Sequence, residues 1–248
     1  MCEVQLWCAA TDVAVDPGLL SPDEHARAWR FRFDRDRRRW IAARVLLRRV
    51  LAGHLGCAPS SLTFTCSDHG KPMIAGHPLH FNLSHSGNLA ICATTRATEI
   101  GVDIEQIRAI DGIDALFRSI SSVREYAAFR SLLPPQRTRA FFETWTAKEA
   151  CVKANGTGLT TPLAQIEVPR PGDPREDITA GPDRWSVHTI SPQPGYVGAL
   201  AFRTQLGHSG RAEITYRTLN LDSSYGEGGA NTTFNNCRSW ARKPVSST

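Results

Sequence analysis

The stretch that decides the fold reads RWIAARVLLR and occupies residues 39–48. It aligns with TWTAKEACVK, residues 144–153, so that Trp40 pairs with Trp145 and Arg48 with Lys153. A second pair of similar segments, residues 84–93 and 191–201, lies at nearly the same offset. A chance resemblance is the alternative. Taken as a repeat, these matches predict two similar halves, each a long helix packed on a small sheet.

The pattern around the two aligned segments predicts an α+β fold. Short apolar or alternating segments between turn signals indicate strands at 4–9, 62–66, 80–83, 89–94, 100–104, 166–168, 185–190, 196–202 and 214–219. Helical spacing and end signals indicate helices at 37–55, 113–117, 122–132 and 138–154, and one that starts at Ser21 as N-cap with Pro22 at its first position. Pro134-Pro135 is expected to break the chain.

These elements give the expected domain organisation. We expect a pseudo-twofold pair of similar subdomains, residues 1–100 and 101–221, each with a long helix on a small, mostly antiparallel sheet. Residues 222–248 are rich in glycine and polar residues, which is typical of a disordered tail.

The composition is that of a soluble globular protein, with 41% hydrophobic and 21% charged residues. No run of 18 apolar residues exists, and the first twenty residues carry acids but no Lys or Arg, so we expect neither a membrane span nor a secretory signal. The seven cysteines are widely spaced and form no C-x-x-C pair. This pattern favours reduced thiols in a cytoplasmic protein over disulfides or a zinc site.

Basic charge gathers between Arg27 and Arg49, in a chain whose formal net charge is +5. Such a segment favours an anionic cofactor, an acidic protein or nucleic acid as a partner. A solvated helix face is the alternative.

Two pairs of charged residues are candidates for chemistry. Asp103 and Glu105 are two apart on an expected strand, so both side chains project from the same face. Adjacent carboxylates repel each other unless a cation or a shared proton lies between them, and oxygen ligands suit Mg²⁺ or Mn²⁺. Glu149 and Lys153 are four apart on one helix face, where Glu149 would act as a ligand or base and Lys153 as a phosphate partner. Solvated acids and a surface ion pair are the alternatives.

The segment 81–87, FNLSHSG, contains an adjacent Ser84 and His85. Adjacent residues of a strand point to opposite faces and no G-x-S-x-G motif is present, which argues against a serine hydrolase. The segment suits a polar loop that binds an anion through backbone amides, the Ser84 hydroxyl and His85.

Taken in order, the motifs are specific. The chain reads Gly70-Lys71-Pro72, FNLSHSG at 81–87, GVDIE at 101–105, then W-x-x-K-E-A-x-x-K at 145–153 followed by Gly156-x-Gly158-Leu159. This series resembles the Sfp-type phosphopantetheinyl transferases from about residue 20 to about residue 202. The resemblance implies two similar α+β halves, in agreement with the repeat.

The resemblance also implies a catalytic centre. Asp103, Glu105 and Glu149 would hold one Mg²⁺, with Mn²⁺ as the alternative ion, against the diphosphate of coenzyme A, the co-substrate. Lys153 matches the lysine that contacts the phosphate beside the reacting bond. Glu149, directly or through water, matches the base, so Glu149 and Lys153 are the expected catalytic residues.

The nucleotide end of coenzyme A has its own expected contacts. Asn82, Leu83, Ser84 and His85 match the segment along the nucleotide, with His85 near the 3′-phosphate, and Lys71 matches a residue at the adenine end. Arg27 matches a basic contact to the 3′-phosphate, and Arg44 is a weaker candidate. Glu24 stands where some relatives have a lysine for the same phosphate.

The expected reaction is holo-[acyl-carrier-protein] synthase activity, EC 2.7.8.7. A serine hydroxyl of an apo acyl or peptidyl carrier protein attacks the β-phosphate of coenzyme A, and adenosine 3′,5′-bisphosphate leaves. Acyl or peptidyl carrier domains are the expected partners, whether of fatty acid, polyketide, nonribosomal peptide or lysine pathways, and the basic charge suits their acidic surfaces. The bipartite repeat favours a monomer, and neither nucleic acid nor membrane is expected as a partner. A nucleic-acid-binding module and a divalent-metal phosphoesterase are the competing hypotheses.

Overall fold

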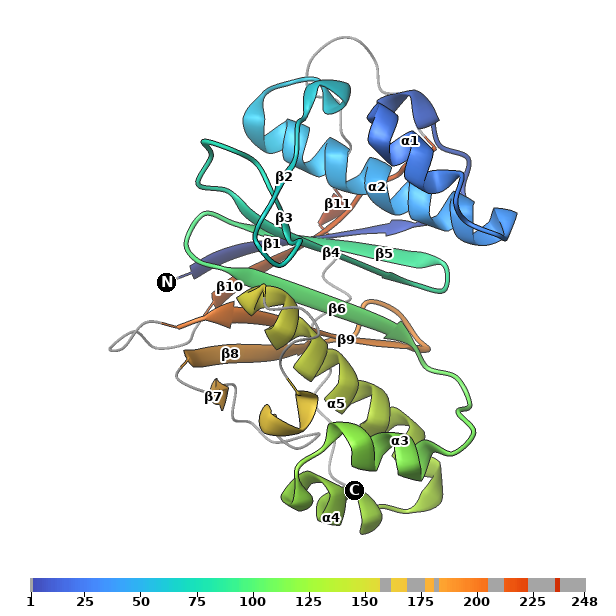
Figure 1. Cartoon of the computed structure of the whole chain (residues 1–248), viewed down its shortest axis with the longest axis vertical. Helices are drawn as coiled ribbons and strands as arrows, with labels where there is room; N and C mark the ends of the chain where they lie inside the picture. Colours follow the sequence, from blue (N-terminus) through green and yellow to red (C-terminus); the bar gives the residue numbers. More distant parts are fainter. Residues whose placement is uncertain are drawn as a thin grey trace.

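Two sheets organise the fold, and they lie one above the other in Figure 1. The structure is a computed structural model that describes residues 2–156, 162–168, 177–180, 183–204, 212–222 and 235–236. The first sheet has the order β11-β10-β1-β5-β4 and the second the order β6-β9-β8-β7. The first contains β1 (Cys2–Ala10), β4 (His80–Ser86), β5 (Leu89–Thr95), β10 (Ala212–Thr218) and β11 (Asn235–Asn236). The second contains β6 (Ile100–Gln106), β7 (Asp177–Ala180), β8 (Asp183–Ile190) and β9 (Tyr196–Arg203), and β2 (Thr65–Cys66) pairs with β3 (Pro72–Met73).

Five α-helices are seen in the described residues. They are α1 (Pro22–Ala28), α2 (Asp34–Leu55), α3 (Ile113–Ile120), α4 (Val123–Arg130) and α5 (Pro134–Asn155). Ser21 caps α1 in a capping box with Glu24, as the sequence predicted for the start of this helix. The long helices α2 and α5 each end at a glycine with positive φ, Gly56 and Gly156, which closes the last turn without a Cβ clash. Among the described residues, no helix is both long and apolar enough to cross a membrane.

The two-half α+β organisation predicted from the repeat is confirmed. Each half has a first strand, a 22-residue helix and a hairpin: β1, α2 and β4–β5 in one, β6, α5 and β8–β9 in the other. The strand orders β1-β5-β4 and β6-β9-β8 also correspond. Helix α2 buries its apolar face against the first sheet, and α5 lies on the second (Figure 1). The aligned segments 39–48 and 144–153 therefore lie in equivalent helices.

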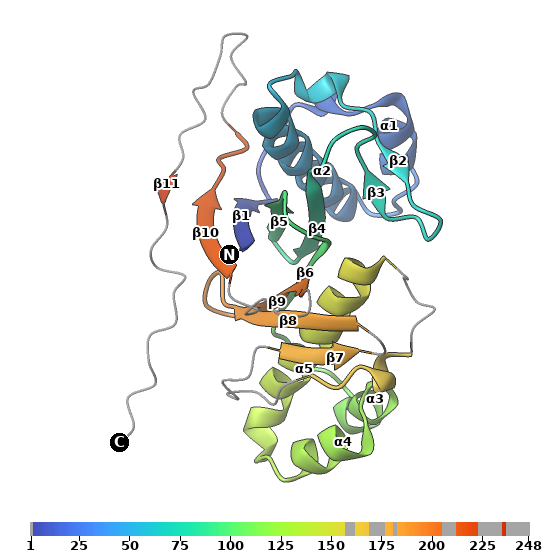
Figure 2. The same ribbon diagram turned by 90° about the vertical axis from the view of Figure 1, so that its left-hand side faces the viewer.

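One strand crosses back from the second half of the chain to the first sheet. Strand β10 pairs in parallel with β1, with Val4 opposite Ile214, and Figure 2 shows it alongside β1. The last strand of the expected unit 101–221 thus belongs to the sheet of the first half. The subdomain boundary at residue 100 stays a prediction, as does the disordered tail, because residues 223–234 and 237–248 lie outside the described residues.

Three local predictions need correction. Pro134-Pro135 does not break the chain: Pro134 is the first residue of α5, where the missing N–H of proline costs no hydrogen bond. The strand expected at 62–66 is reduced to β2 at its end. Residues 166–168 follow a 3₁₀ turn at Leu163–Gln165 and form no strand. Gly158 and Leu159 of the last motif lie outside the described residues.

Candidate active site

The two halves meet along a seam between strands β4 and β6, which belong to different sheets. Side chains of β4 accept hydrogen bonds from backbone N–H groups of β6: Val102 N to Asn82 Oδ1 at 2.9 Å, Ile104 N to Ser84 Oγ at 3.3 Å and Gln106 N to Ser86 Oγ at 3.1 Å. Alternate residues of a strand share a face, so Asn82, Ser84 and Ser86 all reach the same neighbour. The seam satisfies the edge of β6 with side chains instead of a backbone ladder.

Asp103 lies in the middle of this seam and is buried. Its Oδ1 accepts hydrogen bonds from Ser84 Oγ at 2.9 Å and from Lys153 Nζ at 2.6 Å. Its Oδ2 is also buried, and no residue that the structure describes donates a hydrogen bond to it. A buried carboxylate oxygen without a donor is costly, so this atom has the capacity to bind an additional positive group.

Glu105 and Glu149 add two more carboxylates to the same region. Burial raises the pKa of Glu105, and the negative charge of Asp103 raises it further, while a 2.6 Å hydrogen bond from Ser86 opposes the shift. Burial also raises the pKa of Glu149, with added contributions from Asp103 and Glu105 and an opposing one from Lys153. The three acids predicted as metal ligands therefore influence one another electrostatically.

Helix α5 carries Glu149 and Lys153 on the side that faces β6. Gly101 makes this close approach possible, because a Cβ there would overlap the backbone of Ala150 and Ala154. Lys153 Nζ also lies 3.2 Å from Ser84 Oγ and 3.4 Å from Val102 O. The second catalytic residue of the prediction thus contacts both halves.

The donor set fits a divalent cation that prefers oxygen. All the candidate ligands are carboxylates, the chemistry that Mg²⁺ and Mn²⁺ favour, and Asp103 Oδ2 has no other partner among the described residues. The carboxylates are not gathered into a ready-made cluster: within the described ranges, no three His, Cys, Asp or Glu side chains are grouped closely enough to hold a metal ion. Like charges repel, and Lys153 and Ser86 are the partners that the carboxylates use instead.

His85 and Leu83 extend from the opposite face of β4. Leu83 packs against the core of the first half. Desolvation of the ring, together with the positive charges of Lys153 and Arg39, lowers the pKa of His85, although Asp103 opposes the shift. The lowered pKa favours the neutral imidazole, which has one N–H to donate to an anion.

Lys71 connects the β2–β3 turn to the second half of the chain. Its Nζ donates hydrogen bonds at 3.0 Å to Ile100 O and to Ala154 O, at the start of β6 and the end of α5. Burial lowers the pKa of Lys71 to about 8. The lysine ties the β2–β3 hairpin to the second half, and its expected role at the adenine stays a prediction.

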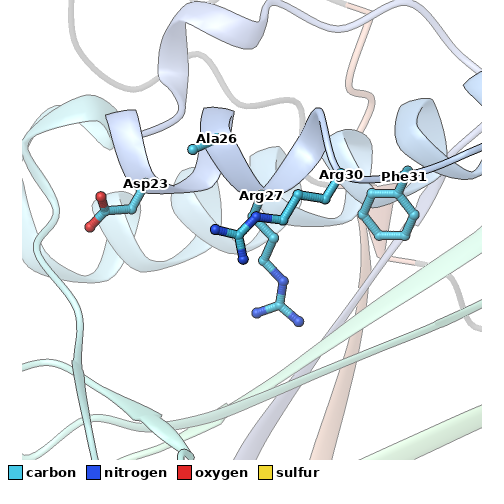
Figure 3. A pocket seen from close by; sticks show the side chains of 5 residues that line it. All are labelled: Asp23, Ala26, Arg27, Arg30 and Phe31. Carbon is cyan, nitrogen blue, oxygen red and sulfur yellow. The ribbon is translucent and has the colours of Figure 1, made fainter.

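Arg27 lines a surface hollow of about 620 Å³ together with Asp23, Ala26, Arg30 and Phe31. Figure 3 shows the Arg27 and Arg30 side chains extending to the same side, with their guanidinium groups next to each other and Asp23 at the far end. Arg27 also lies over the Trp40 ring, 5.7 Å from its centroid. Two cations in one hollow make it suitable for a phosphate group.

Glu24 and Arg44 form an ion cluster in the first half. Arg44 Nε donates to Glu24 Oε1 at 2.6 Å, and the fully buried Arg48 donates to Oε2 at 2.6 Å. Burial alone would raise the pKa of Glu24, but Arg44, the Ser21 backbone N–H and Arg48 lower it overall. Arg44, the weaker candidate for the 3′-phosphate, is therefore paired inside the protein, and so is Glu24.

Two residues at the site were not predicted. Ser86 holds Glu105, and the alternation of polar residues along 82–86 is the signal that would have identified it. Arg30, two residues after the end of α1, lines the hollow with Arg27, and the density of arginines in this segment is the signal that would have identified it.

Comparison with known proteins covers both halves. Residues 9–97 match the family model described as 4′-phosphopantetheinyl transferase, N-terminal, and residues 99–201 match the 4′-phosphopantetheinyl transferase superfamily. The transferase HetI of Nostoc sp. is 39% identical over 209 residues, which cover 80% of this chain and 87% of HetI. Sfp of Bacillus subtilis is 32% identical over 186 residues, 73% of this chain and 81% of Sfp. AcpT of Salmonella typhimurium is 40% identical over 118 residues, 47% of this chain and 58% of AcpT. The seam, its carboxylates and its lysine all fall inside the matched regions, and the chain belongs to the 4′-phosphopantetheinyl transferase superfamily.

Proposed function

We propose that this phosphopantetheinyl transferase moves the 4′-phosphopantetheine arm of coenzyme A onto a serine of an apo acyl or peptidyl carrier protein, with Asp103, Glu105, Glu149 and Lys153 as its reaction centre. The observation that carries the proposal is the buried carboxylate of Asp103 where the two halves meet: its Oδ1 is held by Ser84 and Lys153, and its Oδ2 has no donor among the described residues. A surplus of buried negative charge beside a lysine suits a site that binds a cation and a diphosphate together.

The carboxylates of Asp103, Glu105 and Glu149 would hold Mg²⁺, with Mn²⁺ as the alternative. When bound, the ion would neutralise oxygen charge on the diphosphate. Lys153 is the chain's own positive group here, and its ammonium would hold a phosphate oxygen beside the reacting bond. Phosphoryl transfer depends mainly on positioning and on neutralising charge, so these groups supply most of what the reaction needs.

Glu149 is the proposed base. Its raised pKa makes it a better proton acceptor than an ordinary glutamate, and the positive charge of Lys153 close by favours its ionised form. The serine oxygen forms a bond to the β-phosphorus, the bond from that phosphorus to the bridging oxygen breaks, and adenosine 3′,5′-bisphosphate leaves. The serine proton passes to Glu149, directly or through water.

The nucleotide end would bind along the first half. We propose that Arg27, in its hollow with Arg30, contacts the 3′-phosphate and that the neutral His85 donates to the same group. Asn82, Leu83 and Ser84 would follow the nucleotide on β4, and Lys71 would contact it at the adenine end. Since one chain supplies both halves of the site, we propose a monomer that acts in the cytoplasm on carriers of polyketide or nonribosomal peptide synthesis.

The test is an incubation of the purified chain with coenzyme A, MgCl₂ and a panel of apo carrier domains. Mass spectrometry should find carriers heavier by one phosphopantetheine, and the product should be absent with Glu149→Ala. Phosphate release without carrier modification would instead indicate a phosphoesterase, and retention of DNA without carrier modification would indicate a nucleic-acid-binding module.

A further inference from the structure

The link between α1 and α2 exposes two large aromatic side chains. Trp29 is 70% exposed and Phe33 is 59% exposed, although both residue types usually bury most of their surface. Two arginines lie over them: Arg37 is 4.4 Å from the Trp29 ring centroid, and Arg32 is 5.3 Å from that of Phe33. We call these four residues the α1–α2 corner.

The corner lies in the most basic part of the chain. Residues 27–39 contain seven arginines against two aspartates. Asp34 pairs with Arg37 and Arg38, and Asp36 lies 3.6 Å from Arg35. Among the described residues, Arg32 has no carboxylate partner, so the corner keeps a surplus of positive charge.

A short series of contacts joins the corner to the reaction centre. Arg39, in the first turns of α2, donates a hydrogen bond to Asn88 in the β4–β5 turn. The backbone of Asn88 donates to Tyr196 Oη at 3.0 Å, and two residues earlier Ser86 holds Glu105. Figure 1 agrees: the beginning of α2, the β4–β5 turn and the end of β6 all lie on the right-hand side of the molecule in this view. These contacts place the corner on the side of the molecule where Glu105 lies.

We propose that the α1–α2 corner is a docking surface for an acidic helix of the carrier protein, with Trp29 and Phe33 as its apolar anchors and Arg32 as a cation for a carrier carboxylate. This inference rests on the proposed function and adds where the protein substrate binds. Trp and Arg side chains are among those that contribute most to binding energy at protein interfaces. Opposite charges on the two surfaces also favour rapid and specific association.

An acidic protein fits the corner better than a nucleic acid does. One face of each ring is covered by a guanidinium group, which leaves less room for the stacking of bases on aromatic side chains. The covered rings remain accessible at their edges to the aliphatic side chains of a helix.

The experiment compares Trp29→Ala and Phe33→Ala with the matched control Val123→Ala, an apolar residue in the second half that is 88% exposed. Initial rates are measured with an apo peptidyl carrier domain varied at saturating coenzyme A, and then with coenzyme A varied. Each aromatic variant should raise KM for the carrier on the order of 10-fold, with KM for coenzyme A and kcat nearly unchanged. Val123→Ala should change neither constant.

Direct binding is measured in parallel, by calorimetry with a carrier domain that has alanine in place of its acceptor serine. This measurement tests docking even if the chain transfers nothing, so a failure of the proposed function is distinguished from a failure of the docking surface. Weaker binding by both aromatic variants, and a smaller salt dependence for Arg32→Gln than for the unaltered chain, support the proposal. Melting curves confirm that each variant is folded.

Three results would overturn the docking surface. The first is unchanged carrier binding and KM in both aromatic variants. The second is a loss of carrier affinity in Val123→Ala but not in Trp29→Ala. The third is retention of single-stranded DNA that depends on Trp29 while the affinity for the carrier does not.

Discussion

The two long helices carry charged side chains at equivalent positions of the repeat, and the two halves use them in opposite ways. Arg44 and Arg48 on α2 align with Glu149 and Lys153 on α5. In the first half, both arginines bind the single acid Glu24. In the second half, one lysine faces three carboxylates. The positions are the same, but one cluster has excess positive charge and the other excess negative charge.

The pKa shifts of the two clusters have opposite directions. The pKa of Glu24 is lowered, because two arginines and a backbone N–H outweigh the effect of burial. The pKa of Glu149 is raised, because burial and neighbouring carboxylates outweigh Lys153. An acid whose charge is satisfied within the fold stabilises that fold. An acid with too little positive charge around it in the fold is suited to binding a cation from outside. This difference separates Glu24, whose role is structural, from Glu149, which is a candidate for function.

The largest expected effect comes from breaking the negative cluster. Glu149→Gln keeps the shape of the side chain but removes both a ligand charge and the proposed base. We expect kcat for carrier modification to fall on the order of 10⁴-fold, the upper end of what a general base contributes. The folded structure should be retained, since removing one of several repelling carboxylates relieves repulsion. Single-turnover mass spectrometry measures the rate, and a loss below about 10-fold would exclude Glu149 as the base.

Breaking the positive cluster should have the reverse outcome. Glu24→Gln leaves Arg44 and the fully buried Arg48 without their charge partner. Removing one member of a buried ion pair costs about 3 kcal/mol of unfolding free energy or more. For a chain of this size we expect the melting temperature to fall by roughly 10 °C. The enzyme that stays folded at low temperature should keep its kcat, and a loss of kcat equal to that of Glu149→Gln would contradict the contrast.

The fold could be predicted from sequence largely because its repeat is carried by local signals. Helical periodicity, the Ser21 cap and the terminal glycines are short-range features, and all are confirmed. The pairing of β10 with β1 could not be predicted, because it joins strands at opposite ends of the chain. Pro134 was interpreted as a break because proline both ends and begins helices, and the residues that follow it decide which.

The sequence predicted which residues lie at the site, but not which hydrogen bonds and ion pairs they form there. Alternation along 101–105 indicated that Asp103 and Glu105 share a face, and the structure brings both near Glu149. That Lys153 bonds to Asp103 depends on how closely α5 approaches Gly101, a tertiary feature. The ion cluster of Glu24 was missed for the same reason, since its partners lie 20 and 24 residues away on another helix.

A smaller effect is expected in the stability of the protein as pH and magnesium change. The ordinary pKa of a glutamate is 4.5, and those of Glu105 and Glu149 are raised in the folded chain. The folded state therefore binds more protons than the unfolded state above this value, so these groups lower stability as the pH rises through their folded pKa values. Magnesium at about 100 times its dissociation constant should add about 2.7 kcal/mol at neutral pH.

Melting curves from pH 5 to pH 8, with and without MgCl₂, measure both effects. Glu149→Gln should flatten the loss of stability toward high pH and reduce the gain from magnesium. Glu24 contributes with the opposite sign, since its lowered pKa gives stability that is lost on acidification below its ordinary value. A gain from magnesium that is unchanged in Glu149→Gln would mean that the ion binds elsewhere.

The smallest effect comes from comparing two arginines of the first half, one with a carboxylate partner in the fold and one without. Arg27 has no carboxylate partner among the described residues and lines the hollow, whereas Arg44 is held by Glu24. Arg27→Gln should therefore raise KM for coenzyme A about 10-fold, equivalent to about 1.4 kcal/mol, and leave kcat unchanged. With 3′-dephospho-coenzyme A, which lacks the phosphate, the same variant should match the unaltered chain.

Arg44→Gln should lower the melting temperature without discriminating between the two co-substrates. Equal rises in KM for both co-substrates in Arg27→Gln would show that this arginine binds some other part of the nucleotide, and the hollow would then lose its assignment as the 3′-phosphate site.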